Sequence, residues 1–213
     1  MYLEEIIENV QMESDKFECK AKLNRDDVVG WLKLFLQSIM LVEDLDGKKI
    51  VVIHDIIFKG KRTMEWTDVE AYLKRFVGEE HIIEDTGDLV YIGPDLPDEY
   101  THSNYTMLLR GANAKAKANA AQGIPEMLLI ANEREYEENR KDKHSKNAKY
   151  GWYSYVTRFA LPVYGENGDI ERYNVFRAIM LVRHAEDNKL YLYDIMKIKK
   201  ETSNLFQSED LTQ

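Results

Sequence analysis

The stretch that decides the fold reads YGWYSYVTRFALPVY at residues 150–164, RYNVFRAIMLVRH at 172–184 and KLYLYDIMKIK at 189–199. Each segment is rich in Tyr, Val, Ile and Phe, the residues that fit a pleated, partly buried surface. The connectors GENGD (165–169) and AEDN (185–188) favour tight turns. We therefore expect three consecutive antiparallel strands, a meander, as the core of the protein.

The alternation of side chains along these strands predicts how they pair. With a four-residue loop between the second and third strands, His184 lies opposite Lys189. Arg177 then lies opposite Met196 and diagonal to Asp194, within reach of a cross-strand ion pair. The second strand carries apolar side chains on both faces, so we expect it to be central and covered on both sides.

Upstream of the meander, several segments predict shorter strands. Residues 49–58 are rich in β-branched residues and indicate a buried strand. Residues 81–84 and 89–92 flank a turn and predict a hairpin, and the sequence GPDLPD at 93–98 predicts a rigid loop.

Helical signals alternate with these strands. Thr67 and Glu70 have the spacing of a capping box, which opens a helix that Gly78 ends. Residues 113–122 are rich in the strong helix former Ala, and residues 125–138 predict a further helix with a proline in its first turn.

The order of these elements predicts an α+β fold: an antiparallel meander of three C-terminal strands packed on two helices, with a smaller N-terminal β/α portion. We expect the α+β domain to span residues 44–204. Residues 1–43 are then an N-terminal appendage, and residues 205–213 a flexible tail.

Composition limits the classes of protein to which the chain can belong. No apolar run approaches the roughly 20 residues needed to span a bilayer, so no membrane association is expected. The acidic N-terminus is unlike a signal peptide, and the single cysteine, Cys19, allows no internal disulfide; both favour the cytoplasm. The net charge is −9, yet residues 140–200 hold 13 Lys/Arg against 7 Asp/Glu, a net of +6. This asymmetry is compatible with a face that binds a polyanion and with ordinary solvated charge.

Two segments near the N-terminus, ESDKFECK (13–20) and DDVVGWLK (26–33), resemble the opening of the Schlafen AlbA-type DNA-binding domain. In that family the helix continues into an Ala-Phe-Ala-Asn-like segment and a Gly-rich turn, whereas residues 34–42 here are plainly apolar. The resemblance ends there, so the family's activity is not carried over. Residues 1–33 are compatible with a fusion remnant and with an ordinary strand and helix.

Seven stretches, in order, resemble a domain found in the large polyvalent proteins of phages and conjugative elements. They are FKGKR (58–62), YIGPDLPDEY (91–100), AKAKAN (114–119), KYGWY (149–153), RFALP (158–162), RYNVF (172–176) and LYLYDI (190–195). This resemblance covers residues 44–204 and implies a domain carried by a mobile genetic element. The order of two helices and a meander also resembles the fold group of barnase, EndoU and the colicin E5 and D ribonucleases, which implies metal-independent cleavage of RNA.

Metal-independent RNA cleavage needs a base, an acid and cations that stabilise the charge on phosphorus. His144 before the first strand, Arg158 on it, and Arg183 and His184 at the end of the second strand supply these groups. We expect these four residues to be catalytic, with no metal and no cofactor. The alternative is that His184 is merely solvated beside a turn and that His144 lies in an exposed basic loop.

Basic and aromatic residues at the start of the meander predict contacts with nucleic acid. Lys143, Lys146 and Lys149 surround His144, and Tyr153 lies on the first strand. Unpaired bases stack on tyrosine rings beside cations, so RNA is the expected partner. The alternative for such tyrosines is a core position with a satisfied hydroxyl.

A second functional hypothesis is a non-catalytic module that docks a protein partner or other domains within a larger phage or conjugative protein. A catalytic effector is expected to gather the candidate cations and histidines around one cleft. A docking module is expected to scatter them and to expose an apolar patch.

Overall fold

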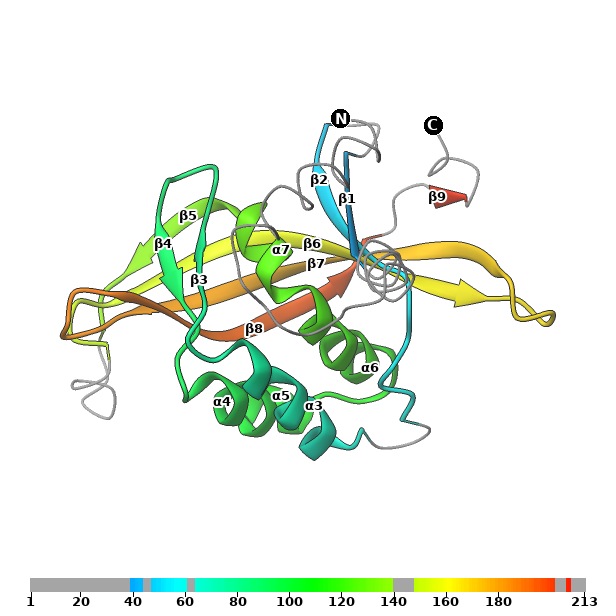
Figure 1. The fold of residues 1–213 in the computed structure, drawn as a ribbon, viewed down its shortest axis with the longest axis horizontal. Helices are drawn as coiled ribbons and strands as arrows, with labels where there is room; N and C mark the ends of the chain where they lie inside the picture. The colour runs from blue at the N-terminus through cyan, green and yellow to red at the C-terminus, as the bar shows by residue number, and fades with distance from the viewer. Residues whose placement is uncertain (1–38, 44–46, 61–63, 140–147, 202–205, 208–213) are drawn as a thin grey trace, which may run out of the picture. The chain divides into compact units, whose positions relative to one another are not determined.

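The computed structural model describes residues 39–43, 47–60, 64–139, 148–201 and 206–207. They belong to one compact unit, Gln37–Gln213. Within this part of the chain, nine strands form one mixed sheet, and helices pack against it (Figure 1). The expected α+β class is confirmed.

The meander predicted from the sequence is present. β6 (Trp152–Tyr164), β7 (Ile170–His184) and β8 (Leu190–Lys200) are long antiparallel strands that lie side by side (Figure 1). The sheet order is β1-β2-β6-β7-β8-β4-β3, with β5 also beside β6 and β9 beside β7. The remaining strands are β1 (Ile39–Glu43), β2 (Lys49–Ile53), β3 (Glu80–Ile82), β4 (Leu89–Tyr91), β5 (Asn132–Glu137) and β9 (Phe206–Gln207).

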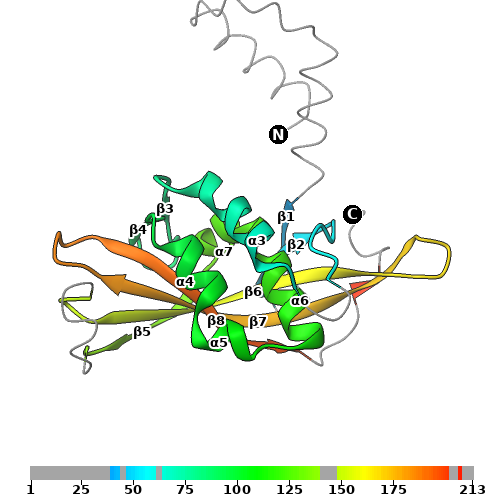
Figure 2. The ribbon, with the colours of Figure 1, turned by 90° about the horizontal axis from the view of Figure 1, so that it is seen from below.

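The helices are short and lie along the long strands (Figures 1 and 2). They are α3 (Trp66–Leu73), α4 (Leu96–His102), α5 (Asn104–Leu108), α6 (Gly111–Ala120) and α7 (Ile124–Leu129), with single 3-10 turns at Lys74–Phe76 and Ala121–Gly123. The Ala-rich helix expected over residues 113–122 is thus confirmed as α6, continued by the second of these turns. Its small side chains allow the helix to approach the sheet closely.

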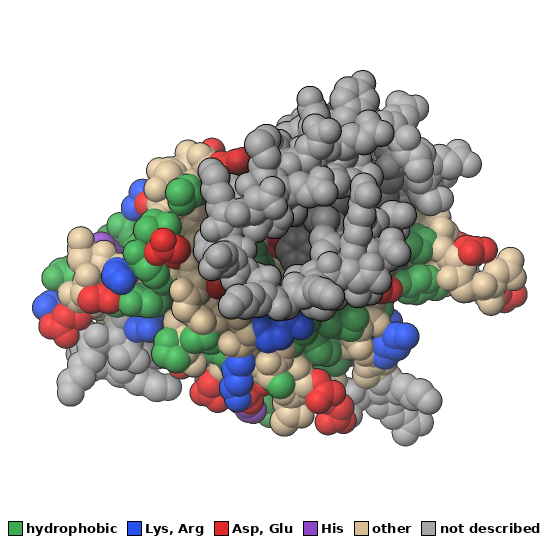
Figure 3. All heavy atoms as spheres, viewed as in Figure 1, with side chains coloured by type: hydrophobic (Ala, Val, Ile, Leu, Met, Phe, Trp, Pro, Cys, Tyr) green, Lys and Arg blue, Asp and Glu red, His purple; other side chains and the backbone are tan. Residues whose placement is uncertain are grey.

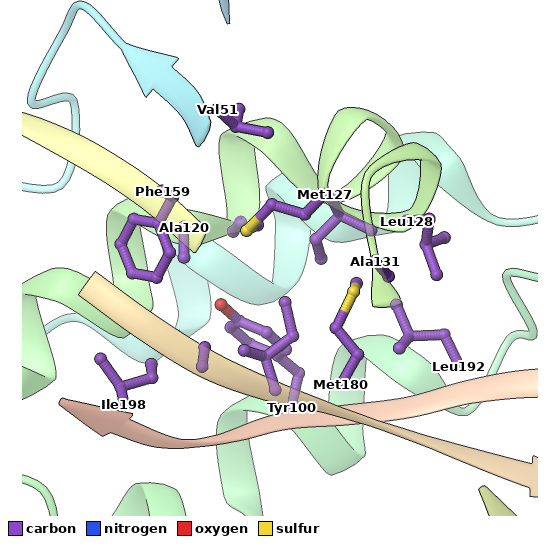
Figure 4. Close-up of a cluster of buried hydrophobic side chains, with 14 of the residues drawn as sticks. Val51, Tyr100, Ala120, Met127, Leu128, Ala131, Phe159, Met180, Leu192 and Ile198 are labelled. Carbon is purple, nitrogen blue, oxygen red and sulfur yellow. The ribbon is translucent and has the colours of Figure 1, made fainter. Parts of the chain in front are cut away.

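The core lies between the helices and one face of the meander. Met127 of α7 and Tyr100 of α4 point toward Phe159, Met180 and Leu192 of the three long strands (Figure 4). A smaller apolar cluster covers the other face of β7 around Tyr173 and Val175. The expected coverage of β7 on both faces therefore holds at this end of the strand, whereas Ile179 and Leu181 are only half-buried on the second face.

The sheet curls around α7, which contacts β2, β3 and β6. Two side-chain contacts join parts of the sheet that are distant in strand order. Lys49 lies 2.6 Å from the carboxylate of Glu84, and the Tyr155 hydroxyl donates to Asp88 at 2.7 Å. The β3–β4 hairpin consequently comes close to β2 and β6.

One predicted helix is partly wrong. α7 (Ile124–Leu129) has the expected proline, Pro125, in its first turn but ends at Leu129. Beyond this point, β5 replaces the helix predicted over residues 125–138. β5 pairs with the free edge of β6, where Tyr136 lies opposite Tyr153. The backbone hydrogen bonds of this pairing outweigh the helix propensity of a Glu-rich segment.

The predicted register between β7 and β8 is also wrong. His184 lies opposite Leu190, not Lys189, because the loop closes with a bond from the Ala185 amide to the Lys189 carbonyl. Two β-bulges then shift the pairing further, so Arg177 lies opposite Lys199. Each bulge adds one residue to β8, and the pattern of apolar residues alone does not reveal this.

Three local expectations are corrected. The strand expected over 49–58 ends at Ile53, because the backbone of Phe58 bonds to a side-chain amide from α6 instead of a neighbouring strand. α3 begins at Trp66 without a side-chain cap, so Thr67 is not its cap. The loop expected over 93–98 gives way to α4 at Leu96.

The sheet extends past the domain boundaries expected at residues 43 and 205. β1 pairs with β2, and β9 pairs with β7, because exposed strand edges accept further strands. The expected helices and strand within residues 1–33 lie outside the described residues.

Candidate nucleic-acid interface

Four ring side chains line up where β5, β6 and β7 meet; we call Tyr136, Tyr153, His184 and Tyr150 the aromatic row. Ring centroids are 5.3 Å apart between Tyr136 and Tyr153, and 6.0 Å apart between Tyr153 and His184. The rings of His184 and Tyr150 are 5.0 Å apart. Tyr136 is 55% exposed and Tyr150 is 42% exposed, so both ends of the row face solvent.

Strand pairing fixes the middle of the aromatic row. Tyr153 lies opposite Tyr136 on one side and opposite Val182 on the other. His184 lies two residues after Val182 and so points to the same face of β7. Paired backbone bonds, from Tyr150 to the His184 carbonyl and from His184 to the carbonyl of Gly151, hold the last two rings together.

Gly151 is required for this arrangement. Its φ is 93°, which favours glycine, and an added Cβ would lie 2.8 Å from the ring and hydroxyl of Tyr136 and from the Glu137 carbonyl. The missing side chain lets the Tyr136 ring lie across the backbone at the start of β6.

Two cations accompany the aromatic row, one beside its inner ring Tyr153 and one beside its end ring Tyr150. The Arg134 guanidinium lies 4.2 Å from the ring centroid of Tyr153, and the Lys149 ammonium lies 5.6 Å from that of Tyr150. Lys149 also pairs with Glu186 at 2.9 Å, and this hydrogen bond raises the pKa of the lysine. Basic, acidic and hydrophobic side chains are interspersed at this end of the meander (Figure 3).

Asp88, on the β3–β4 turn, positions Arg134 over the row. Its carboxylate lies 3.4 Å from Arg134 and accepts hydrogen bonds from Tyr155 and Thr86, each at 2.7 Å. Burial, and then the hydrogen bond to Asp88, raise the pKa of Tyr155 far above its ordinary range, so its hydroxyl remains a neutral donor. Tyr155 is therefore a core residue whose hydroxyl has a hydrogen-bond partner, which is the alternative stated above for tyrosines of the meander.

His184 contributes the only imidazole among the four rings of the aromatic row. Its Nε2 lies 2.9 Å from the side-chain oxygen of Asn188 in the β7–β8 loop. Together with Tyr153 and Lys149, it is one of three candidate residues that the structure brings together. Lys143, His144 and Lys146 lie outside the described residues.

The two candidate arginines lie elsewhere. Arg158 and Phe159 point to opposite faces of β6, and Arg158 pairs in register with Arg177 of β7. The Nε atom of Arg158 lies 3.2 Å from the carboxylate of Glu201. Arg183 points to the other face of β7 from His184, where it pairs with Asp95 at 2.9 Å and stacks 4.8 Å from the Tyr191 ring centroid. Both are held in local ion pairs.

Sequence reasoning missed Arg134 and Tyr136 because their segment was interpreted as a helix. The signal was present in the sequence Glu-Arg-Glu-Tyr-Glu of residues 133–137, which alternates with a period of two. Arg134 and Tyr136 both contact Tyr153, so they share one face of β5, and Glu135 between them points to the other face.

Among the described residues, no group of three or more His, Cys, Asp or Glu side chains is placed to hold a metal ion. No helix in the described part of the chain has the length and apolar character to cross a membrane. Comparison of the chain with protein-family models, curated proteins and solved structures found no match.

Proposed function

We propose that this domain binds an unpaired stretch of RNA on the aromatic row, as an accessory domain of a mobile-element protein. The observation that carries the proposal is the geometry of the row. Four rings from three strands and a turn lie 5.0–6.0 Å apart, with a cation beside the ring of Tyr153 and another beside that of Tyr150.

Stacking is the main source of affinity in this proposal. Each base that stacks on an aromatic side chain contributes about 1–3 kcal/mol in proteins that bind single strands. Tyr136 and Tyr150 are exposed enough to receive a base, whereas Tyr153 packs partly against the core and supports Arg134. Bases within a duplex already stack on one another, so the row favours unpaired nucleotides.

Arg134 and Lys149 supply the phosphate contacts. Lys149 is paired with an exposed glutamate, and such pairs contribute little to stability and exchange readily. A phosphate competes with Glu186 for the ammonium, which makes binding dependent on salt. We take RNA as the nucleic acid because the order of two helices and a meander expected from the sequence resembles the fold group of barnase, EndoU and the colicin E5 and D ribonucleases.

Metal-independent cleavage at the same row is a second candidate function. The observation that favours it is the position of His184 between two tyrosine rings, where an imidazole can exchange a proton with a bound strand. Arg158 and Arg183 lie away from the row, so His144 and the lysines beside it are the remaining candidates to complete such a site.

Binding is tested by fluorescence anisotropy with a labelled unpaired RNA and the same RNA annealed to its complement. Tyr150→Ala should weaken binding of the unpaired strand by about tenfold, the cost of one lost stacking contact. Tyr164→Ala is the matched control, since Tyr164 is also 42% exposed but lies at the other end of β6. Equal affinity for duplex and unpaired RNA, or equal losses in both variants, would contradict the proposal. Absence of RNA binding would favour the docking module, whose best candidate surface holds the exposed Met107 and Leu108.

A further inference from the structure

One buried contact outside the aromatic row brings an amine against a carboxyl group. Nζ of Lys117 on α6 lies 2.5 Å from Oδ1 of Asp194 on β8, and both side chains are buried. The two residues are 77 positions apart in the sequence, so the packing of the helix on the sheet brings them together. Neither residue belongs to the proposed RNA site.

The surroundings of Lys117 do not suit an ammonium group. An ammonium donates three hydrogen bonds, yet among the described residues Asp194 is the only acceptor that Nζ reaches. The rings of Tyr100 and Tyr105 lie 4.5 and 5.0 Å from Nζ and occupy the places of further acceptors. Burial lowers the pKa of Lys117 and raises that of Asp194, although their mutual attraction opposes both shifts. Burial thus favours a neutral amine beside a neutral carboxylic acid.

Both oxygens of the Asp194 carboxyl group accept a further hydrogen bond. The backbone N–H of Ile195 donates to Oδ1 at 2.7 Å, and the Ser103 hydroxyl donates to Oδ2 at 3.0 Å. The Ser103 hydroxyl is itself held by that of Thr106, 3.0 Å away. Fixed donors of this kind stabilise the negative charge that develops on a carboxyl oxygen when a nucleophile attacks its carbon. The site therefore combines a nucleophile, an electrophile and an oxyanion donor.

We propose that Lys117 and Asp194 condense after folding into an intramolecular isopeptide bond. One proton passes from Nζ to Oδ1 along their hydrogen bond, which leaves a neutral amine and a neutral acid. The lone pair of Nζ forms a bond to Cγ, while Ser103 stabilises the negative charge on Oδ2. A second proton moves from nitrogen to Oδ1, the Cγ–Oδ1 bond breaks with its electron pair, and one water molecule leaves. The third proton stays on the amide nitrogen, and the ion pair is the state that precedes the bond.

Two effects favour this condensation inside the fold. Reacting groups that are held in contact have effective concentrations of roughly 10⁵–10⁸ M, which offsets the unfavourable formation of an amide in water. Condensation also removes two charges whose burial is costly. The bond joins α6 to β8 and closes a long loop of the chain, so it stabilises the folded state as a disulfide does.

Mass spectrometry of the full-length protein after denaturation tests the proposal. The parent protein should be lighter than its sequence by the mass of one water molecule. Lys117→Arg keeps the positive charge but lacks the amine nucleophile, so this variant should have its full mass. Trypsin does not cleave after a modified lysine. The parent should therefore yield a branched peptide in which residues 116–134 are joined to residues 190–197.

The part of Ser103 is tested through the rate of the reaction, in protein freshly made by cell-free synthesis. Ser103→Ala removes the donor to Oδ2 and should slow the loss of water by about 100-fold or more, whereas Ser103→Thr keeps a hydroxyl and should restore the rate. Equal rates in Ser103→Ala and the parent would contradict this mechanism.

Three outcomes would overturn the isopeptide bond itself: a parent protein that keeps its full mass after prolonged incubation, a loss of water that persists in Lys117→Arg, or a loss of water located at other residues. The measurement on the parent protein needs no variant to fold. It also needs no RNA, so the isopeptide bond and the RNA site can fail independently.

Discussion

Lys117 of α6 and Asp194 of β8 form a fully buried ion pair. Nζ and Oδ1 lie 2.5 Å apart, and the two side chains are 0% and 1% exposed. The rings of Tyr100 and Tyr105 lie 4.5 and 5.0 Å from the ammonium, and Ser103, which caps α5, donates to the second carboxylate oxygen. Burial raises the pKa of Asp194 and lowers that of Lys117, while their mutual attraction opposes both shifts.

Replacing one member of this pair should be severely destabilising. Lys117→Met leaves a buried carboxylate without its counter-charge and should lower the free energy of unfolding by about 3–5 kcal/mol. The double variant with Asp194→Asn keeps the acceptor for Ser103 and removes the unpaired charge, so it should recover much of that loss. Urea denaturation measures both. A double variant no more stable than Lys117→Met would contradict the account of this pair.

Asn119 supports the irregular segment that follows β2. Its side chain accepts a hydrogen bond from the Phe58 amide at 3.1 Å and donates to the Phe58 carbonyl at 3.0 Å. Asn119→Ala should lower the free energy of unfolding by about 2–4 kcal/mol, because two buried backbone groups lose their partner. Asn113→Ala, an exposed change on the same helix, is the control and should have little effect. Similar midpoints for the two variants in thermal denaturation would show that other groups satisfy Phe58.

His54 should make stability depend on pH. Burial lowers the pKa of His54 below its ordinary value of 6.5, with a smaller opposing effect from Asp55. The unfolded state therefore binds a proton more readily, and the stabilising contribution present above pH 6.5 is lost as the pH falls through the lowered pKa.

His54→Gln removes the titrating group and keeps a polar side chain near the Tyr173 hydroxyl, which lies 3.0 Å from Nδ1. Between about pH 7.5 and pH 5.5, the parent protein should lose more stability than this variant. Urea midpoints at the two pH values provide the measurement. Parallel pH dependence in the two proteins would mean that His54 is not responsible.

The second candidate function predicts cleavage of RNA in the presence of EDTA. His184→Ala and His144→Ala should each reduce such cleavage by about 100-fold or more, the usual contribution of a general acid or base. His144→Ala should also leave the thermal midpoint nearly unchanged. Cleavage that survives both substitutions would place any catalytic centre elsewhere, and a large loss of stability in His144→Ala would indicate a structural role.

The meander could be predicted from the sequence because its determinants are local. β-branched and aromatic residues, with turns at 165–169 and 185–188, define β6, β7 and β8 within two residues at each end. The pairing of β7 with β8 could not, because it depends on two bulges in β8. Lys197 in β8 has a φ of 53°, a left-handed conformation that is uncommon for lysine and that the sequence therefore does not predict.

The candidate site was only partly predictable for a different reason. Tyr153, His184 and Lys149 belong to the meander, and their proximity follows from its order. Arg134 and Tyr136 reach the site through β5. The residues of β5 have a helical propensity, and only the pairing with the edge of β6 makes this segment a strand. Long-range pairing of this kind, like that of Lys117 with Asp194, is not encoded in any local pattern.

The central claim is that unpaired RNA lies on the aromatic row, and photo-cross-linking tests it most directly. A short RNA that carries a photoreactive uridine is irradiated with the protein, and the linked peptides are identified by mass spectrometry. The account predicts cross-links at Tyr136 or Tyr150, which fall when Tyr150 is replaced by alanine. Cross-links confined to the other face of the meander, at Trp152 or Tyr193, would contradict it.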